Sequence, residues 1–149
     1  MASRAIALAL PQKSNTIRIR FSRLELGNPF RMVQFARKGV KPELFYQFAE
    51  SIKMPEKILS GILNIHSRTI GNYMEGKKTL QPAQGEHLLK LIALFEKGEE
   101  LFGNVDEFNY WLKKPFWNAK EKPIDWLETP GGVDLVTDEL SRLAYGDVI

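Results

Sequence analysis

The chain has 149 residues, of which 44% are hydrophobic and 26% are charged. This length allows one compact domain or two small ones and leaves too little chain for a Rossmann or barrel enzyme. The composition is that of an average soluble protein, and the longest apolar run, residues 5–10, is too short to span a bilayer. With no cysteine and only two histidines, His66 and His87, the sequence predicts no disulfide, no metal site, no cofactor and a cytoplasmic location.

Charge is distributed unevenly along the chain. Residues 1–41 contain nine basic residues and one acidic residue, residues 42–97 are nearly neutral, and residues 98–149 carry a net charge of −6. A basic segment suits a polyanion such as DNA, whereas an acidic segment suits a protein surface. We therefore expect the two ends of the chain to face different partners, with solvated charged faces as the alternative.

Residues 1–28 are expected to form a basic N-terminal arm. The apolar run is shorter than a secretory signal requires, and an organellar transit peptide would require a eukaryotic source. The alternation of residues 17–21 has period two, which predicts a short extended segment lying on DNA or on a second subunit, with disorder as the alternative. Arg18, Arg20 and Arg23 are the candidate phosphate contacts of this arm.

From Pro29 onward the pattern is helical. Residues 29–38 form a first predicted helix that Gly39 ends, and residues 42–52 form a second, which begins with a proline in its first turn. A third helix begins at Pro55.

Residues 55–76 have the spacing of a helix-turn-helix. Ser60 is small enough for two helices to cross closely, Asn64 accepts the left-handed conformation of the turn, and Gly76 ends the second helix. The apolar positions that hold this pair to the rest of its domain are Leu59, Leu63, Ile65, Ile70 and Tyr73.

The outward face of the second of these helices carries candidate DNA contacts. Arginine pairs with guanine and asparagine with adenine, while lysines and a helix N-terminus hold phosphates. The candidate DNA-binding residues are Ser67, Arg68, Thr69, Asn72, Lys77 and Lys78. Gly71 costs about 1 kcal/mol inside a helix and favours the alternative, a helical hairpin that no longer binds DNA.

Residues 83–102 are predicted to form the longest helix, with a wide apolar face and with His87 as a packing residue beside it. The residues beyond Gly103 read as a second module, with helices over 106–114 and 133–145 and one turn over 123–127. Val136, Leu140 and Leu143 are expected to face inward. The three tryptophans of this module, Trp111, Trp117 and Trp126, either pack onto the long helix or serve a partner.

Together these patterns predict an all-α chain. A helix-turn-helix domain over residues 29–97 follows the arm, and a small helical domain over residues 98–149 is joined to it through the long helix. The sequence argues against an enzyme, because its adjacent carboxylates point in diverging directions on helices and no glycine-rich phosphate loop follows a strand.

The last third of the chain contains an ordered set of aromatic, apolar, proline and glycine positions. They are Leu101, Phe102, Gly103, Trp111, Leu112, Pro115, Pro123, Trp126, Leu127, Thr129, Gly132, Val136, Leu140, Arg142, Leu143, Tyr145 and Gly146. Their order and spacing resemble the C-terminal toxin-binding domain of the Xre/MbcA/ParS antitoxins. Residues 64–70, Leu80 and the long helix are similar to the Xre-like helix-turn-helix of the same family, so the resemblance covers residues 29–149.

This resemblance implies a non-catalytic antitoxin of a type II toxin–antitoxin system. It implies a RES-domain toxin that consumes NAD as the partner, a C-terminal domain that obstructs the active site of that toxin, and repression of the operon through its own promoter DNA. Because helix-turn-helix repressors usually read paired half-sites, we also expect a homodimer within the toxin–antitoxin complex.

The candidate toxin contacts follow from the same resemblance. They are Trp126, Leu135, Arg142, Tyr145, Gly146, Asp147, Val148 and Ile149. Leu135 is included because it lies off the inward stripe of its helix, and the acidic chain end is a hypothetical mimic of the phosphates of NAD.

Two departures from the family pattern bear on function. Gly71, Asn72 and Tyr73 stand where family members have a more basic recognition helix, and residues 116–122 replace the usual glycine-rich loop. The alternative function is a stand-alone transcription regulator whose C-terminal module dimerises or senses a small molecule, and the neighbouring genes would discriminate between the two.

Overall fold

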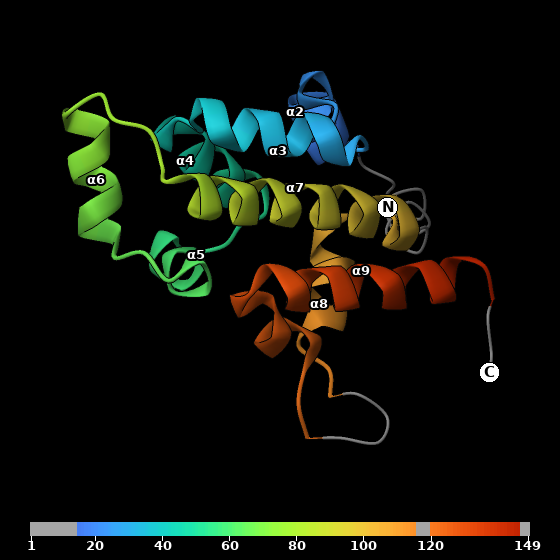
Figure 1. The fold of residues 1–149 in the computed structure, drawn as a ribbon. Coiled ribbons are helices and arrows are strands. Elements are labelled where there is room, and N and C mark those ends of the chain that lie inside the picture. Colours follow the sequence, from blue (N-terminus) through green and yellow to red (C-terminus); the bar gives the residue numbers. More distant parts are fainter. Residues whose placement is uncertain (1–14, 116–119, 147–149) are drawn as a thin grey trace, which may run out of the picture.

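The structure is a computed structural model that describes residues 15–115 and 120–146 (Figure 1). Its elements, in chain order, are α2 (Thr16–Phe21), η1 (Ser22–Leu24), α3 (Pro29–Lys38), α4 (Pro42–Ser51), α5 (Glu56–Leu63), α6 (Ser67–Glu75), α7 (Pro82–Phe102), α8 (Val105–Leu112), η2 (Pro123–Glu128) and α9 (Pro130–Ala144). Over the described residues the only extended pairing is one isolated bridge between Val40 and Leu80. The prediction of an all-α chain is confirmed.

Prolines and short polar side chains set where the helices begin. Proline occupies the first turn of α3, α4, α7 and α9, where its missing N–H costs no hydrogen bond. The side chains of Asn28, Asn104 and Thr129 accept hydrogen bonds from the first turns of α3, α8 and α9. The starts of α3, α4, α7 and α8 lie within one residue of the predicted ones, whereas α9 begins at Pro130, three residues before its predicted start.

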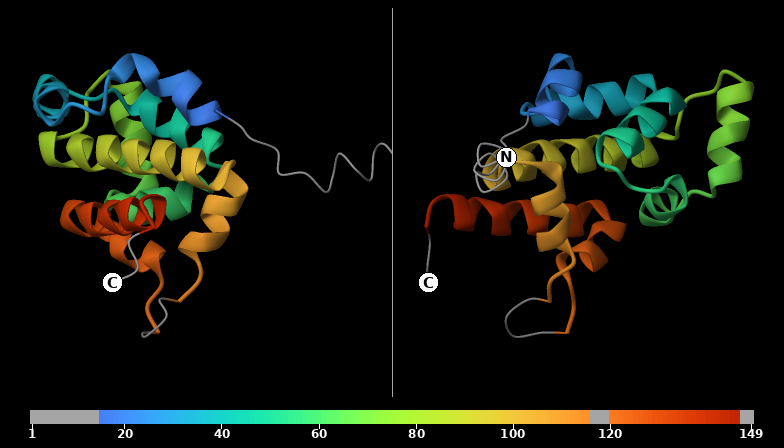
Figure 2. Two further views of the ribbon diagram at one scale, coloured as in Figure 1. Left: turned by 90° about the vertical axis from the view of Figure 1, so that its right-hand side faces the viewer. Right: turned by 180° about the vertical axis from the view of Figure 1, so that it is seen from behind.

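Helix α7 is the central element of the fold. Its 21 residues lie between α3 on one side and α9 on the other, an order that Figure 2 shows from two further directions. Ten of its residues are buried: Gly85, His87, Leu88, Leu89, Leu91, Ile92, Leu94, Phe95, Gly98 and Glu99. A helix that is apolar on so much of its circumference requires cover from several directions. The predicted boundary at residue 97 stays a prediction, and α7 runs through it.

A chain of aromatic rings joins the N-terminal helices to the C-terminal ones across α7. The Phe48 ring lies edge-on to Phe95 at 5.4 Å, and Phe95 lies edge-on to Phe108 at 4.9 Å between centroids. Phe108 in turn stacks with Trp111 at 6.0 Å. Such aromatic pairs stabilise a core beyond the area they bury. Trp111 also lies 5.6 Å from the ring of Phe102 in α7, so it packs onto the long helix, which is one of the two roles considered for the tryptophans. Trp117 lies outside the described residues.

The prediction of an extended segment over residues 17–21 is wrong, because these residues form most of helix α2. Ile17 and Phe21 are fully buried and Ile19 is exposed. Positions i and i+4 share a face in a helix as well as in a strand, so the alternation did not separate the two. The buried carboxylate of Glu99 stabilises the helical conformation, because its Oε1 accepts a hydrogen bond at 3.0 Å from the backbone N–H of Ile17 in the first turn.

The inward orientation predicted for Leu143 is also wrong. Val136 and Leu140 are buried, but Leu143 is 49% exposed. Leu143 lies three residues after Leu140 in the last turn of α9, and the part of the chain that the structure describes does not cover it there.

Polar contacts fasten the C-terminal helices to the N-terminal ones. Lys90 of α7 pairs with Asp134 of α9 at 2.8 Å, and the Asn109 amide of α8 donates to the Ile52 carbonyl at 3.0 Å. His87 is the most buried of these links, with 4% of its surface exposed and its Nε2 2.7 Å from the carbonyl oxygen of Leu127 in η2. Because a carbonyl only accepts, Nε2 carries the proton in this contact.

None of the helices in residues 15–115 and 120–146 combines the length and the apolar character needed to cross a membrane.

The burial of His87 predicts that acid destabilises the fold. Burial lowers the pKa of His87 below the ordinary value of about 6.5, the charge of Lys90 lowers it further, and the contact with the Leu127 carbonyl works in the opposite direction. The unfolded chain therefore binds more protons than the folded chain as the pH falls below about 6.5, so stability is greatest above this pH and declines below it.

We expect His87→Gln, whose amide N–H replaces Nε2–H toward the Leu127 carbonyl, to reduce this decline. The measurement is the free energy of urea unfolding at pH 7.5 and pH 5.5, with His66→Gln, which removes the exposed histidine, as a control for the substitution itself. An equally steep decline in the His87→Gln protein would show that other groups cause the acid sensitivity.

Candidate functional site

Helices α5 and α6 are joined by a short turn at the residues for which the sequence predicts a helix-turn-helix. Asn64 ends α5 in the left-handed conformation, with φ 57° and ψ 37°, as expected for the turn. At the crossing of the helices, the Ser60 hydroxyl lies 3.0 Å from the Ser67 hydroxyl and donates to the Lys57 carbonyl at 3.0 Å, so Ser67 donates to Ser60. The buried Ile70 holds α6 to the body of the domain. A small residue at the crossing thus has the role that its position predicted.

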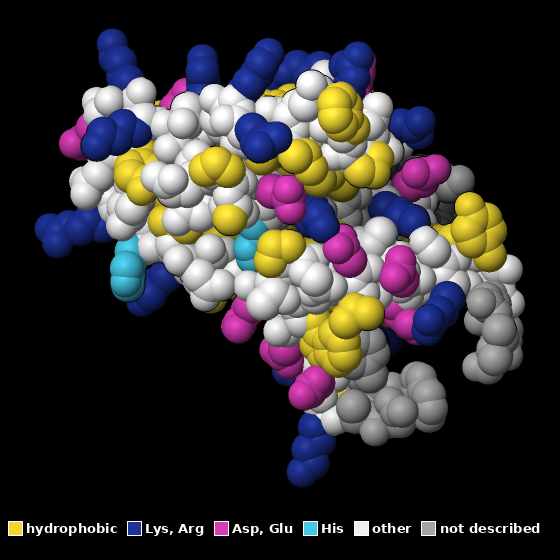
Figure 3. Space-filling view, viewed as in Figure 1, with side chains coloured by type: hydrophobic (Ala, Val, Ile, Leu, Met, Phe, Trp, Pro, Cys, Tyr) yellow, Lys and Arg dark blue, Asp and Glu magenta, His cyan; other side chains and the backbone are white. Residues whose placement is uncertain are grey.

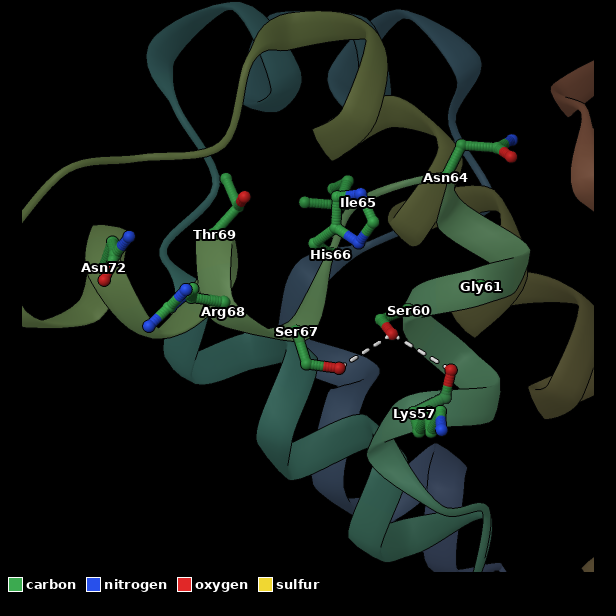
Figure 4. A pocket seen from close by; sticks show the side chains of 10 residues that line it. All are labelled: Lys57, Ser60, Gly61, Asn64, Ile65, His66, Ser67, Arg68, Thr69 and Asn72. Carbon is green, nitrogen blue, oxygen red and sulfur yellow. Dashed lines mark hydrogen bonds between the residues drawn. The ribbon is translucent and has the colours of Figure 1, made fainter.

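An open groove lies between these two helices, which we call the α5–α6 groove (Figure 4). It has a volume of about 890 Å³ and is lined by Lys57, Ser60, Gly61, Asn64, Ile65, His66, Ser67, Arg68, Thr69 and Asn72. The structure therefore brings together four of the predicted DNA contacts, Ser67, Arg68, Thr69 and Asn72. Arg68 and Asn72 are exposed, whereas Ser67 is turned toward Ser60.

The start of α6 faces this groove without a cap. His66 precedes the helix, and no side-chain cap is formed at this N-terminus within the described residues. The free N–H groups of a first turn carry partial positive charge and bind anions such as phosphate. The groove thus combines a positive helix end with the exposed guanidinium of Arg68 and the amide of Asn72.

The other predicted DNA contacts lie elsewhere. Lys77 and Lys78 are exposed in the turn that follows α6, at the opposite end of that helix from the groove. Arg18, Arg20 and Arg23 lie in and next to α2, which packs on α7 near Glu99. At 1.5 Å per residue this point of α7 is roughly 25 Å from its start.

Two of these three arginines already have partners within the protein. Arg20 donates to the Ser51 hydroxyl at 2.9 Å and pairs with Glu50 at 3.3 Å, and Arg23 donates to the Arg20 carbonyl at 3.0 Å. Arg18 is exposed and close enough to Glu96 to act on its carboxyl: burial raises the pKa of Glu96, and the charge of Arg18 opposes the rise. The structure therefore separates these arginines from the α5–α6 groove.

A second hollow lies between η2 and the first turns of α9, and we call it the η2–α9 hollow. It has a volume of about 350 Å³ and is lined by Glu121, Asp125, Trp126, Glu128, Thr129, Gly132 and Leu135. Trp126 is half-buried and Leu135 is 52% exposed, so both predicted toxin contacts present apolar surface here. The Trp126 indole N–H donates to Glu121 Oε2 at 2.8 Å, which fixes the ring and the carboxylate together.

The remaining predicted toxin contacts lie toward the other end of α9. Arg142 is exposed and pairs with Glu139 at 3.3 Å, Tyr145 is 86% exposed, and Gly146 follows with a positive φ of 65°. Tyr145 is ten residues beyond Leu135, roughly 15 Å along the helix. Asp147, Val148 and Ile149 lie outside the described residues.

The acidic residues of the η2–α9 hollow were not predicted. Asp125 and Glu128 are three residues apart in the 3-10 helix η2, and residues at this spacing eclipse one another in such a helix. Reading residues 123–128 as a 3-10 turn would therefore have placed both carboxylates on one face. Figure 3 shows the wider distribution, with Lys and Arg side chains along the edge where α2 and α3 lie and with Asp and Glu side chains gathered around η2 and α9.

One hydrogen bond joins the α5–α6 groove to the η2–α9 hollow. The Asn64 amide, at the turn of the helix-turn-helix, donates to the Glu128 carbonyl at 3.0 Å. Asn64 lines the α5–α6 groove, and Glu128 lines the η2–α9 hollow. The end of η2 therefore packs directly against the turn that positions α6.

Residues 97–146 match a known family model. The model is that of the antitoxin Xre/MbcA/ParS C-terminal toxin-binding domain. The matched residues run from the end of α7 through α8 and η2 to the end of α9, and they include the η2–α9 hollow. A comparison with curated proteins gave no match. The match to this toxin-binding domain supports an antitoxin role and a toxin as the partner.

The start of α9 makes a close approach to η2 that only glycine allows. A Cβ at Gly132 would lie 1.7 Å from the Trp126 carbonyl oxygen, whereas nothing lies within 4 Å of a Cβ at the neighbouring Gly131. We expect Gly132→Ala to force the backbone of η2 away and to destabilise the fold by about 1–3 kcal/mol or more. Gly131→Ala is the matched control and should be neutral or stabilising by up to about 1 kcal/mol.

Urea unfolding of the two variants checks this prediction. Equal stabilities would mean that the contact between Gly132 and η2 does not constrain this part of the fold.

Proposed function

We propose that this chain is the antitoxin of a type II toxin–antitoxin system. In this proposal it neutralises a RES-domain toxin that consumes NAD by blocking the active site of that toxin, and it binds its own promoter DNA to repress the operon. The match of residues 97–146 to a toxin-binding domain carries the proposal. The RES class of the partner rests on the resemblance of the sequence alone.

The exposed surface of the matched segment supports a binding role. Leu135 and Leu143 of α9 and Tyr145 directly after it are large hydrophobic side chains with about half of their surface or more exposed. Apolar side chains of this size, exposed along one helix and rimmed by charge, are typical of a protein interface. We propose that Trp126, Leu135, Arg142, Tyr145 and the residues after it contact the toxin, in a cytoplasmic complex that contains two copies of this chain.

DNA binding is the second part of the proposal. The exposed Arg68 and Asn72 at the uncapped start of α6 have the chemistry to read base edges in a major groove, and the positive helix end suits a phosphate. Gly71, which lowered the expectation of DNA binding, has only the Tyr46 hydroxyl near its Cβ position, at 3.9 Å. We propose that Lys77, Lys78, Arg18 and Arg23 contact phosphates outside the groove, and that Arg20 positions α2.

Neutralisation is tested with the adjacent reading frame, expressed in bacteria alone and together with this chain. We expect the neighbour alone to stop growth and to lower cellular NAD, and co-expression to restore both. Tyr145→Ala removes an exposed aromatic contact and should raise the Kd of the complex at least about tenfold. Tyr110→Ala, which truncates an exposed tyrosine of α8 outside the predicted contacts, is the matched control.

A harmless neighbour that does not co-purify would rule out the antitoxin role and favour a stand-alone regulator. A Tyr145→Ala protein that binds the toxin like Tyr110→Ala would place the interface away from the end of α9.

Repression is tested by fluorescence anisotropy on DNA from upstream of the operon. We expect Arg68→Ala to weaken specific binding by about 1–3 kcal/mol, roughly tenfold or more, with binding to unrelated DNA less affected. Arg18→Ala and Arg23→Ala should instead weaken binding to any sequence and flatten its dependence on salt.

Lys113→Ala, which removes one exposed positive charge directly after α8, controls for net charge. Binding that is insensitive to Arg68→Ala would mean that α6 does not read the operator.

A further inference from the structure

The η2–α9 hollow has an apolar floor and an acidic rim. Its apolar surface comes from the Trp126 ring and from Leu135, and its rim carries the carboxylates of Glu121, Asp125 and Glu128. No residue that lines it is basic. A hollow with an apolar floor, an acidic rim and no basic residue in its lining is complementary to a long side chain with an apolar stem and a cationic end.

The rim is free to receive such a group. In the part of the chain that the structure describes, none of the ion pairs involves Glu121, Asp125 or Glu128. Asp125 Oδ2 accepts from the Lys122 backbone N–H at 3.0 Å, and Glu121 is held by the Trp126 indole, so two of the three carboxylates are fixed in place. All three rim residues are exposed, so a side chain of a partner can reach them.

The combination of an aromatic ring with several carboxylates favours arginine over lysine. A guanidinium is planar, stacks on aromatic faces and donates in a fork that matches carboxylates, whereas an ammonium is more strongly hydrated and acts as a point charge. The surrounding segment adds a long-range field of the same sign, because residues 98–149 carry a net charge of −6. A partner surface attracted to this region is therefore basic.

We propose that the η2–α9 hollow is an anchor site for an exposed arginine side chain of the partner toxin. The site rests on the proposed antitoxin function, since the match to a toxin-binding domain is what makes a toxin the occupant. In this complex the arginine stem lies against Trp126 and Leu135, and the guanidinium contacts Glu128 and Glu121. The close approach of Gly132 to the Trp126 carbonyl keeps the two walls of the hollow together.

The test compares two charge reversals in the full chain with the purified cognate toxin. Glu128→Lys places a positive charge on the rim, and Glu100→Lys makes the same change on an exposed residue of α7 within the same acidic segment. At low salt we expect Glu128→Lys to raise the Kd at least about tenfold more than Glu100→Lys does, because only the former repels a seated arginine. The difference should shrink at high salt, and thermal unfolding of both variants controls for folding.

A photo-crosslinking residue at position 135 identifies the occupant. We expect it to capture a toxin peptide that contains arginine, and replacement of that arginine by alanine should remove most of the difference between the two charge reversals. Equal effects of Glu128→Lys and Glu100→Lys would overturn the anchor site while leaving the antitoxin function intact. So would crosslinking to a second copy of this chain or to a toxin peptide without arginine. A wild-type chain that does not bind the toxin would overturn the function, and the anchor site with it.

Discussion

The contact between Gly98 and Phe108 is the constraint on which the rest of the structure depends. A Cβ at position 98 would lie 2.4 Å from the Phe108 ring, so α8 can approach α7 this closely only because residue 98 is glycine. Phe108 continues the aromatic chain that begins at Phe48 and passes through Phe95. The segment that matches the toxin-binding domain is therefore packed into the same core as helices α5 and α6, and α7 fixes the position of both.

This shared core has a consequence for the two candidate surfaces. The α5–α6 groove and the η2–α9 hollow belong to segments about sixty residues apart in sequence, yet the Asn64 amide and the Glu128 carbonyl join them through one hydrogen bond. A partner that displaced η2 would act on the residue that holds the turn of the helix-turn-helix. Any such effect is reciprocal, because a coupling free energy between two binding sites has the same value in both directions.

Much of the fold could be predicted because its local signals agree with one another. Pro29, Pro42 and Pro82 mark helix starts, and Asn64 lies in the left-handed turn that its side chain tolerates. Pro130 marks the start of α9 in the same way, but the predicted helix began three residues later. The signals failed where two periods coincide, as at Ile17 and Phe21, whose spacing fits a strand and a helix equally well. At Leu143 the apolar pattern continued past the point where the core ends. The α5–α6 groove was predictable since its residues are close in sequence, whereas the rim of the η2–α9 hollow depends on the unforeseen 3-10 geometry of η2.

The polar contacts that could not be predicted join residues that are distant in sequence. Glu99 and His87 are polar residues buried in α7, and burial of such groups is costly unless a partner satisfies them. Their partners, the Ile17 N–H and the Leu127 carbonyl, lie 82 and 40 residues away, so no local sequence pattern predicts them. Each of these two hydrogen bonds also positions another segment of the chain. Glu99 supplies to α2 the cap that its own sequence lacks, and His87 ties η2, with the Trp126 and Glu128 beside it, to the start of α7. A long helix that is buried on most sides can present polar groups to segments at both ends of the chain, and this is how α7 positions the basic and the acidic regions of the protein.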